Sequence, residues 1–145
     1  MEIYSIGFTQ KSAAQFFGAL KSAGIRRLVD IRLNNRSQLA GFTKNTDLPF
    51  FLRELCGAEY VHEPLLAPTQ EMLDEYKKKK GHWADYEELF LALMAKRDIS
   101  SALDPKDFQE PTVLLCSEPT AEKCHRRLVL EYLQCRWDGV IIRHL

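Results

Sequence analysis

Apolar positions along the chain alternate between strand-like runs and helical stripes. Short aliphatic and β-branched runs predict strands at Ile3–Ile6, Arg27–Ile31, Glu59–His62, Thr112–Cys116 and Gly139–Ile142. Between them, apolar residues recur every three or four positions, which predicts helices at Gln10–Ala23, Leu48–Cys56, Thr69–Lys79, Trp83–Lys96 and Ala121–Leu133. This alternation is typical of βαβ units. We therefore expect one compact α/β domain over residues 1–145, with a mostly parallel five-stranded sheet and helices on both of its faces.

Composition narrows the class of protein further. The 20 Lys and Arg residues balance the 20 Asp and Glu residues, which argues against a generally basic nucleic-acid binder but allows a local basic patch. The longest wholly apolar run, Leu89–Ala95, is much shorter than the roughly 18 residues that indicate a membrane span. There is no secretory signal pattern, and 4 cysteines are too few for a disulfide scaffold. We expect a cytoplasmic protein with reduced thiols and no membrane partner.

Polar side chains follow each predicted strand where it ends. Because ligands bind beyond the carboxyl ends of parallel strands, these side chains are candidates for one shared site. In chain order they are Thr9, Asp30, Arg32, His62, Cys116, Glu118, Arg143 and His144. Strand ends are polar in most proteins, but acidic, basic, thiol and imidazole groups together are typical of an active site.

The segment from Cys116 to Arg127, with the sequence CSEPTAEKCHRR, carries the strongest local signal. We expect Thr120 to cap a helix that places Cys124 about one turn inside it. Free amides at a helix start bind anions and lower the pKa of a nearby thiol, so Cys116 and Cys124 are candidate nucleophiles. Each cysteine has an inert core position as its alternative, and His125 has a structural role as its alternative.

The same segment also offers metal ligands. Cys116, Cys124 and His125 carry the thiolate and imidazole groups that zinc prefers. Their spacing is not that of a zinc finger or ribbon, and neighbouring side chains on a helix point about 100° apart, which hinders joint ligation. We expect no cofactor, with zinc on these three residues as the alternative.

A second motif is Asp30-Ile31-Arg32, in which both charged side chains lie on the same face of a strand. The two residues can pair with each other. Alternatively, Arg32 binds an anionic substrate while Asp30 orients it or acts as a base. The polar loop that follows includes Arg36, and it is suited either to phosphate contacts or to plain solvation.

Four blocks of residues point to a known family. They are Ser5–Thr9, Leu28–Arg32 with Arg36-Ser37 downstream, Tyr60–Thr69, and Leu115–Glu118 followed by Cys124–Arg127, with His144-Leu145 at the end. In these blocks the chain resembles the bacterial and archaeal family catalogued as domain of unknown function 488. The resemblance implies a compact α/β domain whose site joins the Asp-x-Arg strand to the Cys-x-Glu…Cys-His-Arg segment, and it adds Arg126 to that site. Family members commonly carry Pro after Asp-x-Arg, where this chain has Asn34-Asn35.

Three functions follow from these residues. The first is a Cys-dependent hydrolase or transferase for a small anionic, phosphate-bearing substrate. Its nucleophile is Cys116 or Cys124, its acid–base group is Glu118 or Asp30, and its substrate-binding residues are Arg32, Arg126, His125, Thr9, His62 and Arg36. The second is a nucleic-acid-binding or processing module that uses the loop after Arg32, the Arg126-Arg127 pair and Lys77–Lys80. The third is a Cys/His metal-binding domain.

Overall fold

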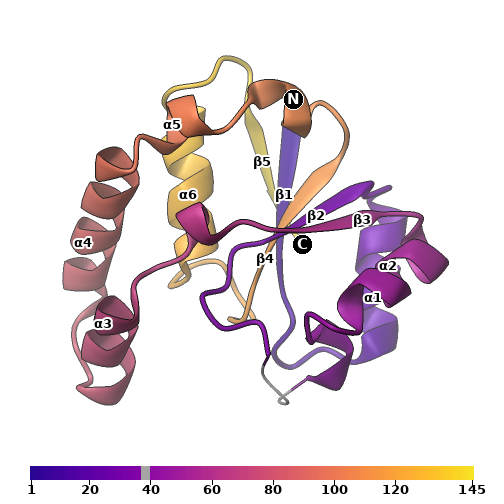
Figure 1. Cartoon of the computed structure of the whole chain (residues 1–145), viewed down its shortest axis with the longest axis horizontal. Coiled ribbons are helices and arrows are strands. Elements are labelled where there is room, and N and C mark those ends of the chain that lie inside the picture. The colour runs from indigo at the N-terminus through magenta and orange to yellow at the C-terminus, as the bar shows by residue number, and fades with distance from the viewer. Residues whose placement is uncertain (37–39) are drawn as a thin grey trace.

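Within residues 1–36 and 40–145, which the computed structural model describes, five parallel strands form one sheet (Figure 1). The strands are β1 (Glu2–Gly7), β2 (Arg27–Asp30), β3 (Glu59–His62), β4 (Thr112–Cys116) and β5 (Ile141–His144). Their order across the sheet is β3-β2-β4-β1-β5, and every residue of the central strand β4 is buried. The predicted parallel α/β sheet is therefore confirmed.

Helices cover both faces of this sheet, as the sequence predicts. They are α1 (Ala13–Ser22), α2 (Leu48–Cys56), α3 (Gln70–Leu73), α4 (Trp83–Lys96), α5 (Ile99–Ala102) and α6 (His125–Gln134). Helices α1 and α2 lie on one side of the sheet, whereas α6 lies on the other side with α4 packed outside it (Figure 1). Helix α3 continues into a π-helical turn, Asp74–Lys78. No helix in the described part of the chain is long and apolar enough to cross a membrane.

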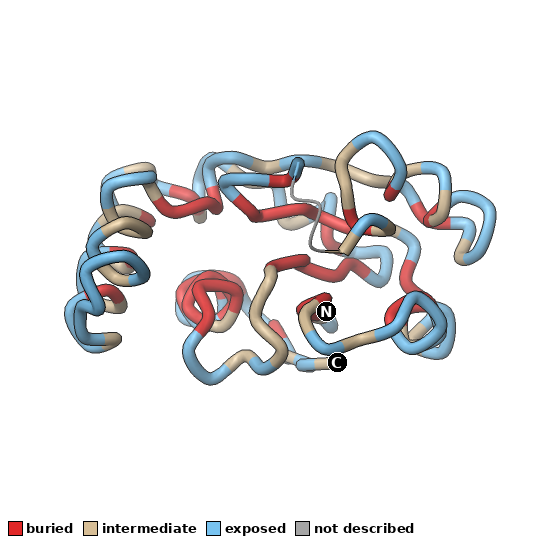
Figure 2. The backbone as a smooth tube through the Cα atoms, turned by 90° about the horizontal axis from the view of Figure 1, so that it is seen from below, coloured by how far each residue is buried: buried red, intermediate tan, exposed pale blue. Residues whose placement is uncertain are grey.

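Two hydrophobic clusters attach these layers to the sheet. Alternating strand residues divide between them: Leu28 packs beneath α1 and α2, and its neighbour Val29 packs on the side of α4 and α6. Buried residues accordingly follow the strands and the inner sides of the helices (Figure 2). With both faces of the sheet covered, the carboxyl ends of the strands are the open edge at which polar groups can meet a ligand.

Several element boundaries differ from the sequence prediction by one to four residues; α1, for example, begins at Ala13 rather than at Gln10. Two of these differences have a clear structural reason. The last strand begins at Ile141 rather than at Gly139, which has φ +72° and belongs to the turn before it. The predicted helix Ala121–Leu133 begins only at His125, because residues 117–124 form an irregular loop. The second difference changes the geometry of the candidate site.

Candidate active site

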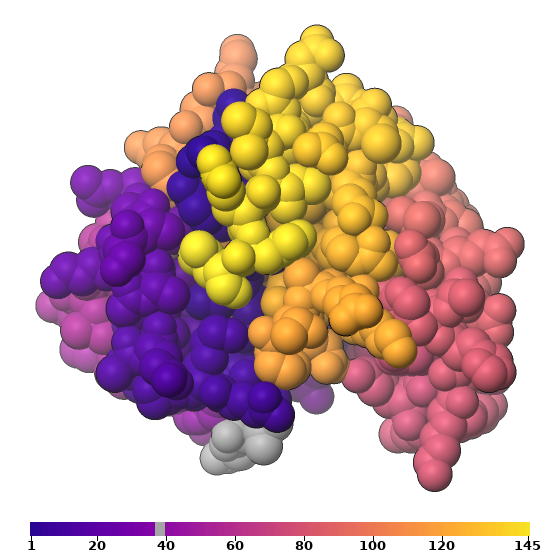
Figure 3. Space-filling model, turned by 180° about the vertical axis from the view of Figure 1, so that it is seen from behind, coloured from indigo at the N-terminus to yellow at the C-terminus, as the bar shows by residue number. Residues whose placement is uncertain are grey.

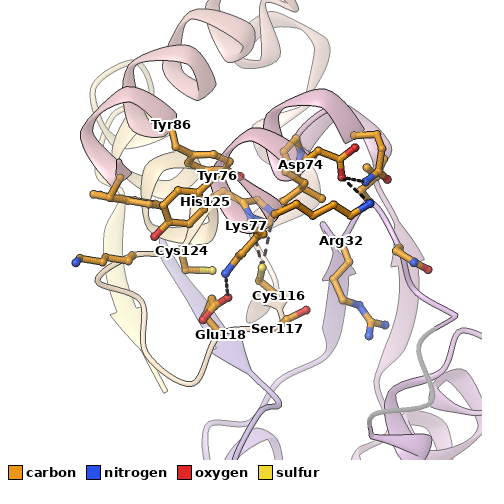
Figure 4. A pocket seen from close by; sticks show the side chains of 18 residues that line it. Arg32, Asp74, Tyr76, Lys77, Tyr86, Cys116, Ser117, Glu118, Cys124 and His125 are labelled. Carbon is orange, nitrogen blue, oxygen red and sulfur yellow. Dashed lines mark hydrogen bonds and ion pairs between the residues drawn. The ribbon is translucent and has the colours of Figure 1, made fainter. Parts of the chain in front are cut away.

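A cavity of about 320 Å³ opens at the carboxyl edge of the sheet, between the loop that leads into α6 and the segment of α3 and α4. In the space-filling view, a notch separates these two segments (Figure 3). Figure 4 labels ten of the lining residues: Arg32, Asp74, Tyr76, Lys77, Tyr86, Cys116, Ser117, Glu118, Cys124 and His125. Trp83 and Lys123 also line the cavity. The Cys-x-Glu…Cys-His segment and the Asp-x-Arg strand therefore meet at one cavity.

Cys116 and His125 form a buried pair at the wall of this cavity. Strand β4 ends at Cys116, and its Sγ lies 3.4 Å from Nδ1 of His125, the first residue of α6. The other ring nitrogen, Nε2, lies 2.9 Å from the carbonyl oxygen of Ile31. A carbonyl can only accept a hydrogen bond, so Nε2 carries the proton in the neutral ring. Nδ1 of His125 then presents its lone pair to the thiol of Cys116.

Cys124 completes this cluster from a position that the sequence analysis placed wrongly. It is the N-cap of α6, with extended backbone angles of φ −140° and ψ 138°, and it is not one turn inside a helix. The expected 100° separation of Cys124 and His125 therefore does not apply. The ligand atoms of Cys116, Cys124 and His125 lie within 4.8 Å of one another, and all three residues are buried.

The surroundings of the cluster shift the pKa values of its two thiols in opposite directions. Burial opposes ionisation of Cys116, but hydrogen bonds from Cys124 and from the two following backbone amides, with the charge of Arg126, lower its pKa. The hydrogen bond to Cys116 and burial raise the pKa of Cys124. Burial lowers the pKa of His125. Cys116 therefore loses its proton more readily than Cys124, and the His125 ring stays neutral and able to accept a proton.

Arg126 lies behind the cluster rather than in the cavity. Its side chain is 1% exposed, and its Nη1 donates to the carbonyl oxygen of Glu118 at 2.6 Å. Its Nε has no hydrogen-bond partner, and no carboxylate pairs with it among the described residues. A Cβ on Gly7 would collide with the Glu118 carbonyl oxygen and with Nη1 of Arg126, so this packing requires glycine. Arg126 thus holds the loop after Cys116 and contributes its positive charge from behind it.

The Asp30–Arg32 pair is a buried ion pair. Nε and Nη2 of Arg32 donate to the two carboxylate oxygens of Asp30 at 2.9 and 2.8 Å, and Tyr60 donates to the same carboxylate at 2.6 Å. Arg32 also donates to the carbonyl oxygen of Thr43 at 2.6 Å. Arg32 lines the cavity and Asp30 does not, and each is committed to the other. Of the two acid–base candidates, Glu118 is the one at the cavity.

Glu118 is held by Lys77, which belongs to the run Lys77–Lys80 that the sequence offers as a contact for nucleic acid. Nζ of Lys77 donates to Oε1 of Glu118 at 2.6 Å. Lys78 and Lys79 pair with acidic residues of their own helical segment. The run of four lysines is visible in the sequence, but local spacing does not show that Lys77 pairs with Glu118, 41 positions further along the chain. These ion pairs also reduce the free charge that Lys77–Lys80 would offer to nucleic acid.

Thr9, His62 and Arg36 do not line the cavity. The backbone amide of Thr9 donates to the carbonyl oxygen of Ser117 at 3.1 Å, which ties β1 to the loop after Cys116. Nε2 of His62 lies 3.0 Å from the carbonyl oxygen of Arg32, and Arg36 is exposed. Ser37, next to Arg36, lies outside the described residues.

These observations define a parallel α/β protein with a Cys/His cluster at the carboxyl edge of its sheet. Comparison with known protein families matches residues 12–133 to the family described as domain of unknown function DUF488. The chain belongs to this family, as its residue blocks predict. Comparisons with curated proteins and with solved structures found no match.

Proposed function

We propose that the protein is a Cys-dependent hydrolase or transferase that acts on a small anionic, phosphate-bearing substrate in the cavity, with Cys116 as its nucleophile. The observation that carries the proposal is the pair formed by Cys116 Sγ and His125 Nδ1, 3.4 Å apart at the cavity wall. A nucleophile within reach of a base that is itself oriented by a third group is the usual arrangement for covalent catalysis. The Ile31 carbonyl is the orienting group here.

The proposed reaction transfers the phosphoryl group in two steps through Cys116. Cys116 Sγ attacks phosphorus, a P–S bond forms, and the bond from phosphorus to the leaving oxygen breaks. Nδ1 of His125 takes the thiol proton and releases it to solvent as the thiolate forms, and the leaving oxygen takes a proton from solvent. Water attacks the phosphorus next, the P–S bond breaks, and the water proton returns through Glu118 to the thiol. In a transferase, an acceptor hydroxyl takes the place of water.

Binding of the anion falls to groups around the cluster rather than to Arg32, whose charge is neutralised by Asp30. The amides of Ser117 and Glu118 interact with the Cys116 sulfur, and donors placed there would also stabilise negative charge on a bound phosphate. Lys123 and Lys77 line the cavity, and no ion pair engages Lys123 among the described residues. This arrangement supports a substrate with its charged end at Cys116.

The proposal is tested by the alkylation rate of each cysteine against pH, followed by peptide mass spectrometry on the native, reduced protein. Cys116 should react with a midpoint below the ~8.5 of a free thiol, because neighbouring donors stabilise its thiolate. Arg126→Met should raise that midpoint by about one unit and slow alkylation at pH 7 about ten-fold, since a positive charge favours the thiolate. The proposal fails if Cys116 reacts only when the protein unfolds.

Arg127→Met is the matched control for that experiment. Arg127 is the next residue of α6, but its guanidinium lies at the surface and pairs with Glu87 and Glu131. Its replacement should leave the Cys116 midpoint unchanged. An equal shift in both variants would mean that general charge, and not the placement of Arg126 behind the loop, sets the acidity of the thiol.

A second candidate, a zinc centre, is favoured by the same three side chains. The Nδ1 lone pair of His125 faces Cys116, Cys124 lies beside them, and Nε2–H of His125 donates to a backbone carbonyl. Metal-binding histidines almost always donate their second ring N–H in this way. Two thiolates and one imidazole leave a fourth position toward the cavity, which is typical of catalytic zinc sites.

Zinc content decides between the two candidates. If the centre is real, the protein purified from zinc-supplemented medium should hold close to one zinc per chain by elemental analysis, and Cys124→Ser should lower this content at least ten-fold. The exposed Cys135 offers a matched control, and Cys135→Ser should keep the metal. Apo protein that takes up no zinc at equimolar concentration would rule the centre out.

A further inference from the structure

Three aromatic residues contribute to one wall of the cavity. Tyr76 comes from the π-helical turn, and Trp83 and Tyr86 come from the first turn of α4. The ring centroids of Trp83 and Tyr86 are 5.2 Å apart with an interplanar angle of 25°, and Tyr76 lies 5.6 and 5.1 Å from them. All three residues line the cavity, and Figure 4 shows Tyr76 and Tyr86 on the side across from Cys116.

This aromatic wall stands opposite a polar, charged end. Cys116 and Ser117 lie across the cavity from Tyr76 and Tyr86 (Figure 4), and Lys123 is also part of the lining. Tyr86 is buried and stacks on both Trp83 and Phe90, so the half-buried rings of Tyr76 and Trp83 are the ones that can meet a ligand. These rings favour a flat, apolar group, whereas the opposite end favours an anion. A sugar phosphate or inorganic phosphate would not use the rings of Tyr76 and Trp83. The ligand that satisfies both ends carries a planar aromatic group and a phosphate.

Hydrogen-bonding groups next to the wall indicate which kind of aromatic group fits. The Gln70 amide and the Asp74 carboxylate line the cavity, and Gln70 Nε2 donates to Asp74 Oδ1 at 2.8 Å. The remaining amide and carboxylate atoms can bond to a ring that has donors and acceptors on its edge. Nucleobases have such edges and a plain phenyl ring has none. A cavity of about 320 Å³ is at the small end of ligand sites, which suits a single nucleotide.

We propose that the substrate is a mononucleotide, with its base against Tyr76 and Trp83 and its phosphate at Cys116. The position of the phosphate at Cys116 rests on the proposed function. The base–aromatic contact itself needs no catalysis, so it can be measured as binding.

Isothermal titration calorimetry of the intact wild-type protein tests this directly. The ligands are AMP, GMP, CMP and UMP, with ribose 5-phosphate, adenosine and O-phosphotyrosine as references. At least one mononucleotide should bind about ten-fold more tightly than all three references, because stacking and the phosphate both contribute. The proposal is overturned if no mononucleotide exceeds ribose 5-phosphate ten-fold, or if O-phosphotyrosine binds as tightly as the best of them.

Tryptophan fluorescence locates the binding. The chain has 2 tryptophans, and Trp137 is buried away from the cavity, where its Nε1 donates to the Ser100 carbonyl oxygen. In Trp137→Phe, Trp83 is the sole reporter, and the best mononucleotide should change its emission saturably, with the calorimetric Kd. Binding without any change at Trp83 would overturn the proposed wall.

A pair of variants at Tyr76 separates stacking from folding. Tyr76→Phe keeps the ring and should bind the best mononucleotide as the wild type does, whereas Tyr76→Leu removes the ring and should bind it about ten-fold more weakly. Equal affinity in the two variants would overturn the stacking role. If Cys116 alkylates as a thiolate but mononucleotides do not bind, only the substrate class fails. If they bind and Cys116 is inert, the nucleophile fails instead.

Discussion

Replacement of Arg32 by methionine is expected to lower the free energy of unfolding by about 3–5 kcal/mol, because it leaves the buried carboxylate of Asp30 without its counter-ion. Both members of the pair are almost fully inaccessible, at 3% and 0% side-chain exposure. The methionine keeps much of the apolar volume of the arginine, so the loss is mainly electrostatic. Urea denaturation of both proteins, read by tryptophan fluorescence, measures the difference.

Two further variants interpret that result. Arg36→Met removes an exposed arginine from the same segment and should change the free energy of unfolding by no more than about 0.5 kcal/mol. The double variant Asp30→Asn with Arg32→Met removes both charges and should recover part of the loss. A cost below about 1 kcal/mol for Arg32→Met would show that the pair is not structural, and Arg32 would return to the list of residues free to bind an anion.

The sequence alone predicts those parts of the fold that depend on the spacing of apolar residues and on the order of the elements along the chain. Apolar runs predicted β3 and β4 to the residue, and the helical stripe predicted α4 in the same way. The strand–helix alternation predicted a parallel sheet, and that sheet brings Asp30 and Cys116 to one edge. In the observed register Gly7 is beside Cys116, and Asp30 is beside Leu115.

Sequence reasoning failed where long-range contacts decide local conformation. Thr120 follows a proline and has the side chain of a good N-cap, yet α6 begins four residues later than predicted. Arg126 bonds to the Glu118 carbonyl, and Cys124 packs beside Cys116, so residues 117–124 wrap around the cluster instead of coiling. The same limit hid the aromatic wall. The apolar spacing of Trp83–Lys96 agrees with the burial of Tyr86 and Phe90 in the core, but nothing local indicated that the π-helical turn would bring Tyr76 to the same cavity as the cysteines.

The exchange of Cys116 for serine should lower turnover of a phosphate-bearing substrate by about a thousand-fold or more, the usual effect of removing a nucleophile. The serine hydroxyl ionises at far higher pH than the thiol, so the Cys116 thiolate is lost although His125 remains. In the wild type, the rate should rise with pH as Cys116 ionises and then level off. Because the pKa of Cys116 is lowered, the plateau should begin below the ~8.5 of a free thiol. Steady-state kinetics across pH 5–9 would show both effects.

The other cysteines supply the controls for this experiment and separate the nucleophile from the zinc centre. Cys124→Ala removes the hydrogen bond that stabilises the Cys116 thiolate, so it should move the plateau to higher pH and retain the maximal rate within a few-fold. Cys135→Ser should change neither, because Cys135 is exposed and distant from the cavity lining. A zinc centre would behave differently, since Cys116 and Cys124 would then be ligands of the same ion. Loss of activity in both variants, together with loss of bound metal, would therefore contradict the nucleophile and assign the cluster to zinc.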